Sequence, residues 1–241
     1  MSDEPPAELP QSLGRLLQRD DFNSDRLQLI AKAMAASGET PFITDVERAE
    51  LLDTVRAAIA PGADLWVFGY GSLMWNPAIK VAESRKARIS GYTARFCLSI
   101  RMGRGTREKP GLMLGLDEGD YCIGIAHRVA PEHVDSELTV LWLREMFSGA
   151  YLPVWVDAEM DGEGPQRALT FAVNRKNPRY EGILDEETIA QRIAEAEGFI
   201  GTNRDYLFRT VSHLSEIGVT DGPLHVIAGL VREITKEGNG S

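Results

Sequence analysis

The chain has 241 residues, of which 43% are hydrophobic and 26% charged, and its formal net charge is −10. This length suits one large domain or two small ones, and the composition is that of an ordinary globular protein. The negative charge argues against nucleic acid and anionic membranes as partners, because both are bound through clustered Lys and Arg. No stretch approaches the ~18 consecutive apolar residues of a membrane span, and the N-terminus, MSDEPPAELP, lacks a secretion signal. We therefore expect a cytoplasmic protein that does not bind membranes.

The N-terminal part is predicted to be an arm followed by helices. Residues 1–10 are rich in proline and are expected to be disordered, and a broken helical stretch follows near Ser12–Met34. A second helix begins at the capping-box pattern Thr44-x-x-Glu47 and ends at Pro61-Gly62. From these limits we predict three parts: an N-terminal arm and helical extension over 1–62, the main domain over 63–235, and a flexible tail over 236–241.

The middle of the chain reads as strands and its last quarter as helices. The predicted strands are Leu65–Phe68, one or two over Ala87–Arg101, a pair at Gly111–Leu116 and Tyr121–Val129 joined by an acidic turn at Asp117–Asp120, then Leu152–Val156 and Ala168–Val173. The predicted helices are a central one opened by Pro131, then Glu186–Gly198, Asn203–Ile217 with Asn203 as its cap, and Leu224–Ile234. Strands grouped between helices indicate an α+β fold rather than alternating βα units.

A glycine-containing turn, Gly69-Tyr70-Gly71-Ser72, directly follows the first strand. Glycine lets the backbone come close to a ligand, so that N–H groups can hold an anion or an oxyanion without a basic side chain. The sequence lacks the third glycine of a dinucleotide-binding fingerprint and the Lys of a phosphate-binding loop. A plain strand–turn connection remains an alternative on spacing alone.

An acidic residue lies where the central helix should carry an apolar one. The apolar stripe of this helix is Val134, Leu138, Leu141 and Trp142, and the next position in phase is Glu145. Burial and the negative end of the helix dipole both raise the pKa of a carboxyl, which suits a general base near neutral pH. The alternative is that Glu145 lies at a frayed helix end and pairs with a neighbour such as Arg144.

The cysteines and histidines give no sign of a metal site. Cys97 and Cys122 lie among apolar residues and are expected to be buried free thiols, with a disulfide as the minor alternative. The histidines show no metal-ligand spacing.

Several motifs together resemble the ChaC-type γ-glutamylcyclotransferases. They are VFGYGSLMW (Val67–Trp75), Arg95-Phe96, GTREKPG (Gly105–Gly111), GIAHRV (Gly124–Val129), LREMFSGAY (Leu143–Tyr151) and GFIGTNRDYLFRTVSHL (Gly198–Leu214). The glycine turn followed in order by the LRE motif is specific in combination.

This resemblance implies a fold and an activity. The fold would be a mixed, mostly antiparallel, small barrel-like sheet with surrounding helices. The activity would be the conversion of glutathione to 5-oxoproline and cysteinylglycine without metal or cofactor, with glutathione as the partner molecule. The resemblance maps the catalytic acid onto Glu145 and the γ-glutamyl-binding turn onto Tyr70, Gly71, Ser72 and Leu73, which Met74 and Trp75 follow. It also maps a further tyrosine onto Tyr151.

Other roles stay open at this point. Arg95 is a candidate for a substrate carboxylate or an ordinary structural Arg, and Tyr151 either bonds the substrate or packs. Ser72 lacks the partners of a nucleophilic serine. Phe171 stands where human-type members carry Tyr, and Cys97 replaces a family aromatic residue. The alternative functions are a cyclotransferase acting on other γ-glutamyl amides and a non-catalytic regulator of cation transport. The sequence leaves the oligomeric state undetermined.

Overall fold

A five-stranded closed barrel forms the centre of the computed structural model, which describes residues 19, 41–162 and 164–237. Its strands are β1 (Leu65–Gly69), β2 (Glu83–Ile100), β3 (Gly111–Val129), β4 (Tyr151–Met160) and β5 (Gln166–Val173). They are ordered β1-β3-β2-β4-β5 and closed by β5 pairing with β1. The pairs that β5 makes with β1 and β3 are parallel and the others are antiparallel. The predicted mixed, mostly antiparallel, barrel-like α+β fold is confirmed.

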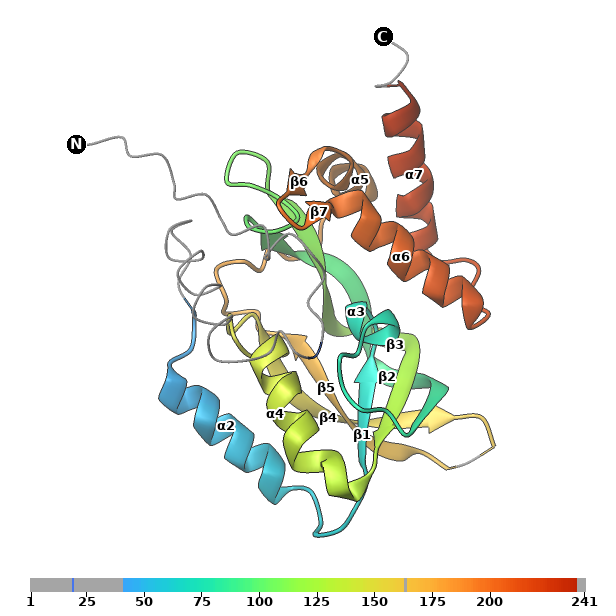
Figure 1. Ribbon diagram of the computed structural model, residues 1–241. Coiled ribbons are helices and arrows are strands. Elements are labelled where there is room, and N and C mark those ends of the chain that lie inside the picture. Colours follow the sequence, from blue (N-terminus) through green and yellow to red (C-terminus); the bar gives the residue numbers. More distant parts are fainter. Residues whose placement is uncertain (1–18, 20–40, 163, 238–241) are drawn as a thin grey trace, which may run out of the picture.

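The helices cover the barrel in two groups (Figure 1). Helices α2 (Asp45–Ala57) and α4 (Val134–Glu145) lie side by side, with the 3-10 turn η3 (Pro131–His133) leading into α4. Helices α5 (Glu186–Glu195), α6 (Asn203–Glu216) and α7 (Pro223–Glu237) gather at the opposite side. The four-residue helix α3 (Ser72–Trp75) follows β1, and a small hairpin of β6 (Glu197–Gly198) and β7 (Gly201–Thr202) precedes α6.

Strand β1 is buried on both faces because it lies between the two helical groups. Leu65 and Val67 pack into the apolar cluster that contains α2 and α4, whereas Phe68 packs into the cluster that contains α5, α6 and α7. Successive side chains of a strand point to opposite faces, so one short strand joins both cores. The strand therefore ends at a point where the backbone has little freedom to move, which fixes the start of the glycine turn.

The predicted N-terminal extension contributes contacts to α4. The predicted capping box is present, with Thr44 and Glu47 bonding each other's backbone N–H groups. Trp142 of α4 donates its indole N–H to the carbonyl of Arg48 at 2.8 Å, and Arg19 forms an ion pair with the buried Glu137. The rest of the stretch predicted as helix at Ser12–Met34 lies outside the described residues, and the boundary at 62/63 stays a prediction.

The acidic turn predicted at Asp117–Asp120 is wrong, because β3 runs through it as one strand paired with β2. Tyr92 and Thr93 of β2 lie opposite Glu118 and Asp117 in a long antiparallel ribbon. Glu118 and Asp120 are exposed on this ribbon, whereas Asp117 is buried and pairs with Arg175. A shift of register occurs at Gly91, which has a φ of +83°. Polar alternation on an exposed ribbon and a polar turn look alike in sequence, which explains the error.

Differences from the prediction also occur at the ends of the last three helices. The cap of α6 is Thr202, whose hydroxyl accepts the N–H of Asp205, and Asn203 is instead buried. The helix expected to reach Gly198 ends at Glu195, because Glu197–Gly198 pairs as β6. Helix α7 continues to Glu237, into the region predicted as a tail.

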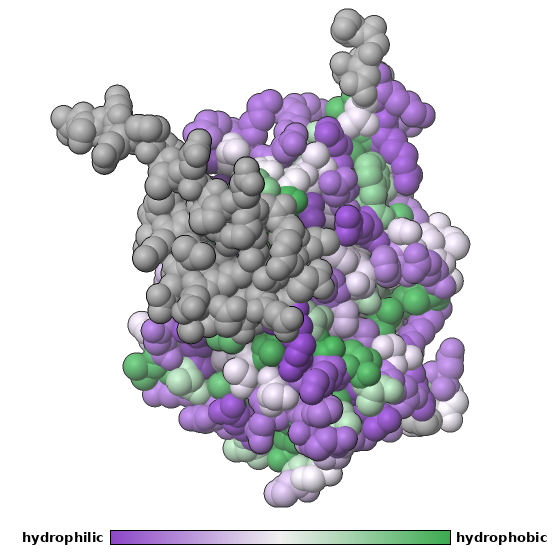
Figure 2. All heavy atoms as spheres, in the orientation of Figure 1, coloured by the Kyte–Doolittle hydropathy of each residue, from purple (hydrophilic) through white to green (hydrophobic). Residues whose placement is uncertain are grey.

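The described surface agrees with the charged composition. Figure 2 shows mostly hydrophilic residues on the visible described face, with apolar residues in separate small areas. Among the described helices, none is both long and apolar enough to cross a membrane.

Candidate active site

The turn after β1 needs glycine for steric reasons. A Cβ on Gly69 would lie 2.8 Å from the Cβ of Leu73, and a Cβ on Gly71 would lie 2.9 Å from the hydroxyl oxygen of Tyr206. Both distances are shorter than side chains tolerate. The glycines of the predicted motif therefore permit the close approach of the turn to α3 and α6.

The turn leaves three backbone donors unused. The carbonyl of Gly71 accepts the N–H of Met74 at 2.9 Å, and that of Ser72 accepts the N–H of Asn76 at 2.8 Å. Within the described part of the chain, the N–H groups of Gly71, Ser72 and Leu73 have no acceptor. These three residues line one cavity, which makes their N–H groups candidate donors to a bound molecule.

Glu145 is the last residue of α4, and its side chain enters the same cavity. The side chain is only 14% exposed, and burial raises the pKa of the carboxyl above its ordinary range. Arg144 opposes this shift through an ion pair in which its Nε lies 2.7 Å from Oε1 of Glu145. Both sequence interpretations of Glu145 are therefore present together: the acid points inward and also pairs with its neighbour.

Arg144 connects the acid to the turn. Its guanidinium donates to the hydroxyl oxygen of Ser72 at 2.8 Å and also to the carbonyl of Asn76. The same side chain holds Glu145. Because a guanidinium is a planar group with several donors, one residue can fix the position of the turn relative to the carboxylate.

The cavity has a volume of about 190 Å³ and is rich in tyrosine. Tyr70 donates to the carbonyl of Phe171 at 2.9 Å, and Tyr151 donates to the carbonyl of Leu114 at 2.8 Å. Its lining residues are Tyr70, Gly71, Ser72, Leu73, Met113, Leu114, Arg144, Glu145, Tyr151, Phe171 and Tyr206. Burial raises the pKa of all three tyrosines, and the charge of Glu145 adds to the shift, so the hydroxyls stay protonated.

Tyr206 differs from the other two tyrosines in the use of its hydroxyl. Its oxygen accepts a hydrogen bond from the backbone of Leu114. Among the described residues, no acceptor takes its own O–H hydrogen. The ring is 3% exposed and is fixed by edge contacts with Phe96 and Trp75. A rigid tyrosine with a free donor therefore lies beside the turn.

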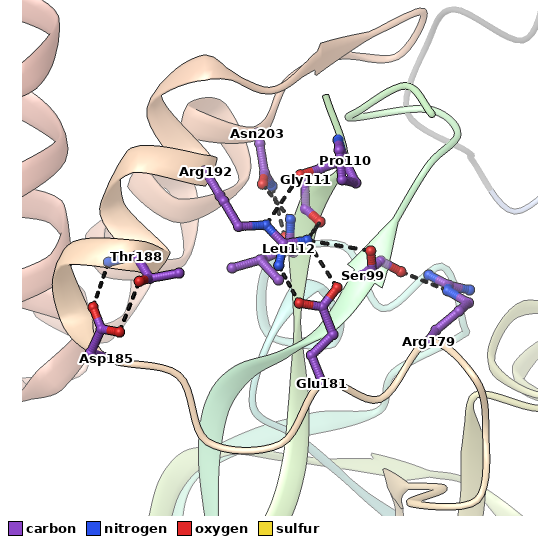
Figure 3. A network of polar contacts seen from close by, with 10 residues as sticks. All are labelled: Ser99, Pro110, Gly111, Leu112, Arg179, Glu181, Asp185, Thr188, Arg192 and Asn203. Carbon is purple, nitrogen blue, oxygen red and sulfur yellow. Dashed lines mark hydrogen bonds and ion pairs between the residues drawn. The ribbon is translucent and has the colours of Figure 1, made fainter. Parts of the chain in front are cut away.

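A network of polar contacts secures the strand that forms one wall of the cavity (Figure 3). Asn203 of α6 brackets Leu112: its amide oxygen accepts the Leu112 N–H at 2.7 Å and its amide nitrogen donates to the Leu112 carbonyl at 2.8 Å. Arg192 pairs with Glu181 and reaches the carbonyl of Gly111. Met113 and Leu114, the next two residues of β3, line the cavity.

We predict that Asn203→Ala strongly destabilises the protein. The substitution leaves two buried backbone groups of Leu112 unpaired, which costs about 2–4 kcal/mol and lowers the Tm by roughly 5–15 °C. Thermal unfolding followed by circular dichroism measures the change. The control is Ser212→Ala, which changes an exposed side chain. Asn174 is not a suitable control position, because its own side chain makes a buried hydrogen bond. A Tm within 2–3 °C of the wild type would contradict the bracketing role.

Comparisons with known proteins show to which family the chain belongs. The model of the ChaC-like protein family matches residues 65–234. The chain belongs to the ChaC family. The glutathione-specific γ-glutamylcyclotransferase of Escherichia coli K12 is 38% identical over 205 residues, covering 85% of this chain and 89% of the relative. The human glutathione-specific γ-glutamylcyclotransferase 1 is 33% identical over 168 residues, covering 68% and 76%.

A solved structure of a yeast protein shares the fold. The crystal structure of a glutathione-specific γ-glutamyl cyclotransferase from yeast, labelled with selenomethionine, has a TM-score of 0.65 and 21% identity to this chain. The similar region covers 71% of this chain and 96% of the yeast chain.

The ChaC motifs predict most of the cavity but not all of it. Tyr70, Gly71, Ser72, Leu73, Tyr151 and Glu145 all line it. Met74 is buried in the core, and Trp75 packs against Tyr206 without lining the cavity. Arg95 also lies outside it, because its guanidinium donates to the carbonyl of Glu118 on the exposed ribbon. The structure therefore gives no support to Arg95 as a substrate-carboxylate residue.

Two residues that line the cavity, Arg144 and Tyr206, are not predicted as site residues from the sequence. Arg144 precedes Glu145 in the LRE motif, and its position in the sequence predicts only a possible ion pair with Glu145. Tyr206 lies in the tail motif, where nothing in its spacing separates it from a core tyrosine. Phe171, in contrast, contributes its backbone carbonyl to Tyr70, so the lack of a hydroxyl leaves that contact intact.

The cysteines of this ChaC chain are poor candidates for a catalytic nucleophile, and its described residues are poor candidates for a metal site. Cys97 and Cys122 are buried free thiols, as predicted, and burial raises the pKa of each to about 12. Over the described ranges, no group of three His, Cys, Asp or Glu side chains is arranged to hold a metal ion. A second cavity of about 520 Å³ lies beyond Tyr70, but the buried acid and the free turn donors are in the smaller one.

Proposed function

We propose that this ChaC-family chain degrades glutathione by intramolecular cyclisation of its γ-glutamyl group, with Glu145 as general acid and base. The observation that supports this proposal best is the position of Glu145, a buried carboxylate in a cavity whose turn carries unused N–H donors. The ChaC relatives from Escherichia coli and human are named as glutathione-specific γ-glutamylcyclotransferases. The products are 5-oxoproline and cysteinylglycine.

The reaction forms one bond and breaks another. The α-amine nitrogen of the glutamyl group bonds to its own γ-carbonyl carbon, and the bond from that carbon to the cysteine nitrogen breaks. Since nucleophile and electrophile belong to one molecule, holding the glutamyl chain curled supplies much of the rate. Well-oriented internal attack is worth ~7–11 kcal/mol. The small tyrosine-lined cavity is suited to holding a curled glutamyl group rather than an extended peptide.

Glu145 would move the proton. The α-ammonium of the substrate must lose a proton before its nitrogen can attack, and the departing cysteine nitrogen must gain one. A single carboxylate between these two atoms can accept the first proton and deliver the second. The raised pKa of Glu145 brings its basicity closer to neutral pH, where such transfer is efficient.

The oxyanion of the tetrahedral intermediate would be held by the turn. The N–H groups of Gly71, Ser72 and Leu73 and the O–H of Tyr206 are donors without acceptors among the described residues. Removing one fixed donor that is directed at a developing charge typically costs ~2.7–4 kcal/mol. Backbone and phenol donors add no charge, so the acidic protein needs no basic patch to bind an anionic substrate.

A covalent serine mechanism is disfavoured. The hydroxyl oxygen of Ser72 accepts a hydrogen bond from Arg144, which is a cation and cannot remove the proton of the hydroxyl. Within the part of the chain that the structure describes, no histidine lines the cavity. Ser72 is instead a structural contact of the turn.

The proposal is tested by incubating the purified chain with glutathione and measuring 5-oxoproline by mass spectrometry. γ-Glutamyl-alanine, assayed in parallel, separates a glutathione-specific enzyme from one that acts on other γ-glutamyl amides. Binding of glutathione without 5-oxoproline from either substrate would overturn the proposal and favour a non-catalytic regulatory protein. We further propose a cytoplasmic location. We also propose that nucleic acid is not a partner, because the net charge of −10 disfavours binding to a polyanion.

The pH profile of kcat/KM should move when Arg144 is replaced. The carboxylate of Glu145 must be ionised to accept a proton, so activity falls as pH falls through its raised pKa. The charge of Arg144 lowers that pKa, and Arg144→Gln removes the charge. We expect the acidic limb of the profile to shift to higher pH by about 1 unit or more.

The position of the limb is independent of any general loss of rate in this variant. Arg88→Gln, which changes an exposed arginine outside the cavity, should leave the profile unchanged. An acidic limb that stays in place or moves to lower pH in Arg144→Gln would show that Glu145 does not set it.

A further inference from the structure

His127 of β3 is buried beneath the glycine turn without lining the cavity. It is 3% exposed and pairs with Val67 of β1 on one side and Ser84 of β2 on the other. Its ring therefore extends from the middle of a rigid part of the barrel. It reaches the turn at Leu73, in the same segment that carries the free N–H donors.

The contacts of His127 fix which nitrogen carries the hydrogen. Nε2 lies 3.0 Å from the carbonyl oxygen of Leu73, and a carbonyl only accepts, so Nε2 must donate. Nδ1 lies 2.8 Å from the hydroxyl of Ser84, which then donates to it. Burial lowers the pKa of His127, and the nearby charge of Arg144 lowers it further. The ring is thus a neutral imidazole in a single tautomer.

This bond completes the anchoring of the turn. The carbonyls of Gly71, Ser72 and Asn76 are held by Met74 N–H, Asn76 N–H and Arg144 respectively. The carbonyl of Leu73 is held by His127. Each planar peptide unit carries a carbonyl and the N–H of the next residue on opposite sides, so holding the Leu73 carbonyl also fixes the N–H of Met74. That N–H donates to the carbonyl of Gly71, whose own peptide unit carries the free N–H of Ser72.

We propose that the Ser84–His127 pair is a positioning unit: it holds the Leu73 carbonyl against the barrel and, through the bond from the Met74 N–H to the Gly71 carbonyl, keeps the N–H of Ser72 directed at the substrate. Ser84 donates to Nδ1 of His127 and so keeps the ring hydrogen on Nε2. His127 donates that hydrogen to the carbonyl of Leu73. Neither residue touches the substrate. The inference rests on the proposed function, in which the turn donors stabilise the oxyanion.

The test compares variants that keep or remove the donor. His127→Met fills a similar space without an N–H, and we expect kcat to fall about 10–100-fold with little change in KM, because the donors act mainly in the transition state. His127→Gln places an amide N–H near the original Nε2 and should recover much of the lost kcat. Ser84→Ala should lower kcat less. His133→Gln is the matched control, since His133 makes no side-chain cap contact and lies outside the cavity.

Rescue by Gln distinguishes positioning from packing. Equal losses in the Met and Gln variants, or an unchanged kcat in a folded His127→Met, would overturn the inference. Thermal unfolding of each variant shows whether the barrel is intact.

A spectroscopic measurement separates this inference from the proposed function. Nitrogen-15 NMR of His127 should show a hydrogen on Nε2 and none on Nδ1, and the backbone amide signals of Ser72 and Leu73 should shift in His127→Met. Unchanged amide signals, or a hydrogen on Nδ1, would overturn the positioning unit. A wild-type chain that shows the expected signals but releases no 5-oxoproline would overturn the proposed function alone.

Discussion

Replacing Glu145 with glutamine should reduce 5-oxoproline release from glutathione by about 10³-fold or more, since proton transfer by a positioned group contributes up to about 10⁴-fold. The amide has nearly the shape of the carboxylate but cannot accept the ammonium proton. Arg144 keeps its bonds to Ser72 and to the carbonyl of Asn76, so the turn should stay in place. The loss should therefore appear in kcat, measured from initial rates with saturating glutathione.

The control for this variant is Glu132→Gln, which makes the same chemical change at an exposed position just before the same helix. It should retain wild-type activity. Circular dichroism should show both variants folded. A Glu145→Gln enzyme with a turnover within 10-fold of the wild type would contradict general acid–base catalysis by this residue.

Gly71→Ala should lower kcat about 10²–10³-fold, the effect expected when an oxyanion donor is misplaced. The new Cβ would lie 2.9 Å from the hydroxyl oxygen of Tyr206. That ring cannot retreat easily, because Phe96 and Trp75 hold it at its edges and it is 3% exposed. Either the turn or the tyrosine must move, and both carry donors of the proposed oxyanion site. The crowding should also destabilise the fold by about 1–3 kcal/mol.

Gly164→Ala is the matched control, since a Cβ at Gly164 meets nothing within 4 Å. It should change neither kcat nor the Tm. Initial rates and thermal unfolding of the two variants separate a local effect from a general one. Wild-type turnover in Gly71→Ala would show that the close approach of turn and tyrosine is not needed for the reaction.

The sequence predicts a site residue where that residue breaks an otherwise regular pattern of apolar positions. The apolar stripe of α4 is regular, so a carboxylate in phase with Trp142 indicates a buried acid, and Glu145 was found this way. The glycine turn is predicted because two glycines directly after a buried strand let the backbone come close to a ligand. The closed barrel came from the resemblance to the ChaC family, since strand periodicity does not determine which strands pair.

The errors concern residues whose role depends on distant parts of the chain. Asn203 is a residue type that favours the N-cap position of a helix. In the fold, however, its side-chain amide hydrogen-bonds the backbone of Leu112, which is 91 residues away in sequence. Arg95 and Arg144 are equally plausible cations in the sequence, and only the folded ribbon and helix decide which one reaches the turn. Tyr206 becomes a site residue because α6 crosses beside Gly71.

The free N–H groups at Gly71, Ser72 and Leu73 have a consequence for how such sites evolve. A donor that belongs to the main chain is present whatever side chain the residue carries, provided that the backbone keeps its path. The side chain of Leu73 can therefore change as long as the turn stays packed. Ser72 is constrained by its bond to Arg144, the glycines by the lack of space for a Cβ, and Glu145 by its role in proton transfer. Divergence of side chains along this turn should accordingly be a poor measure of divergence in the reaction, and the shape of the turn a better one.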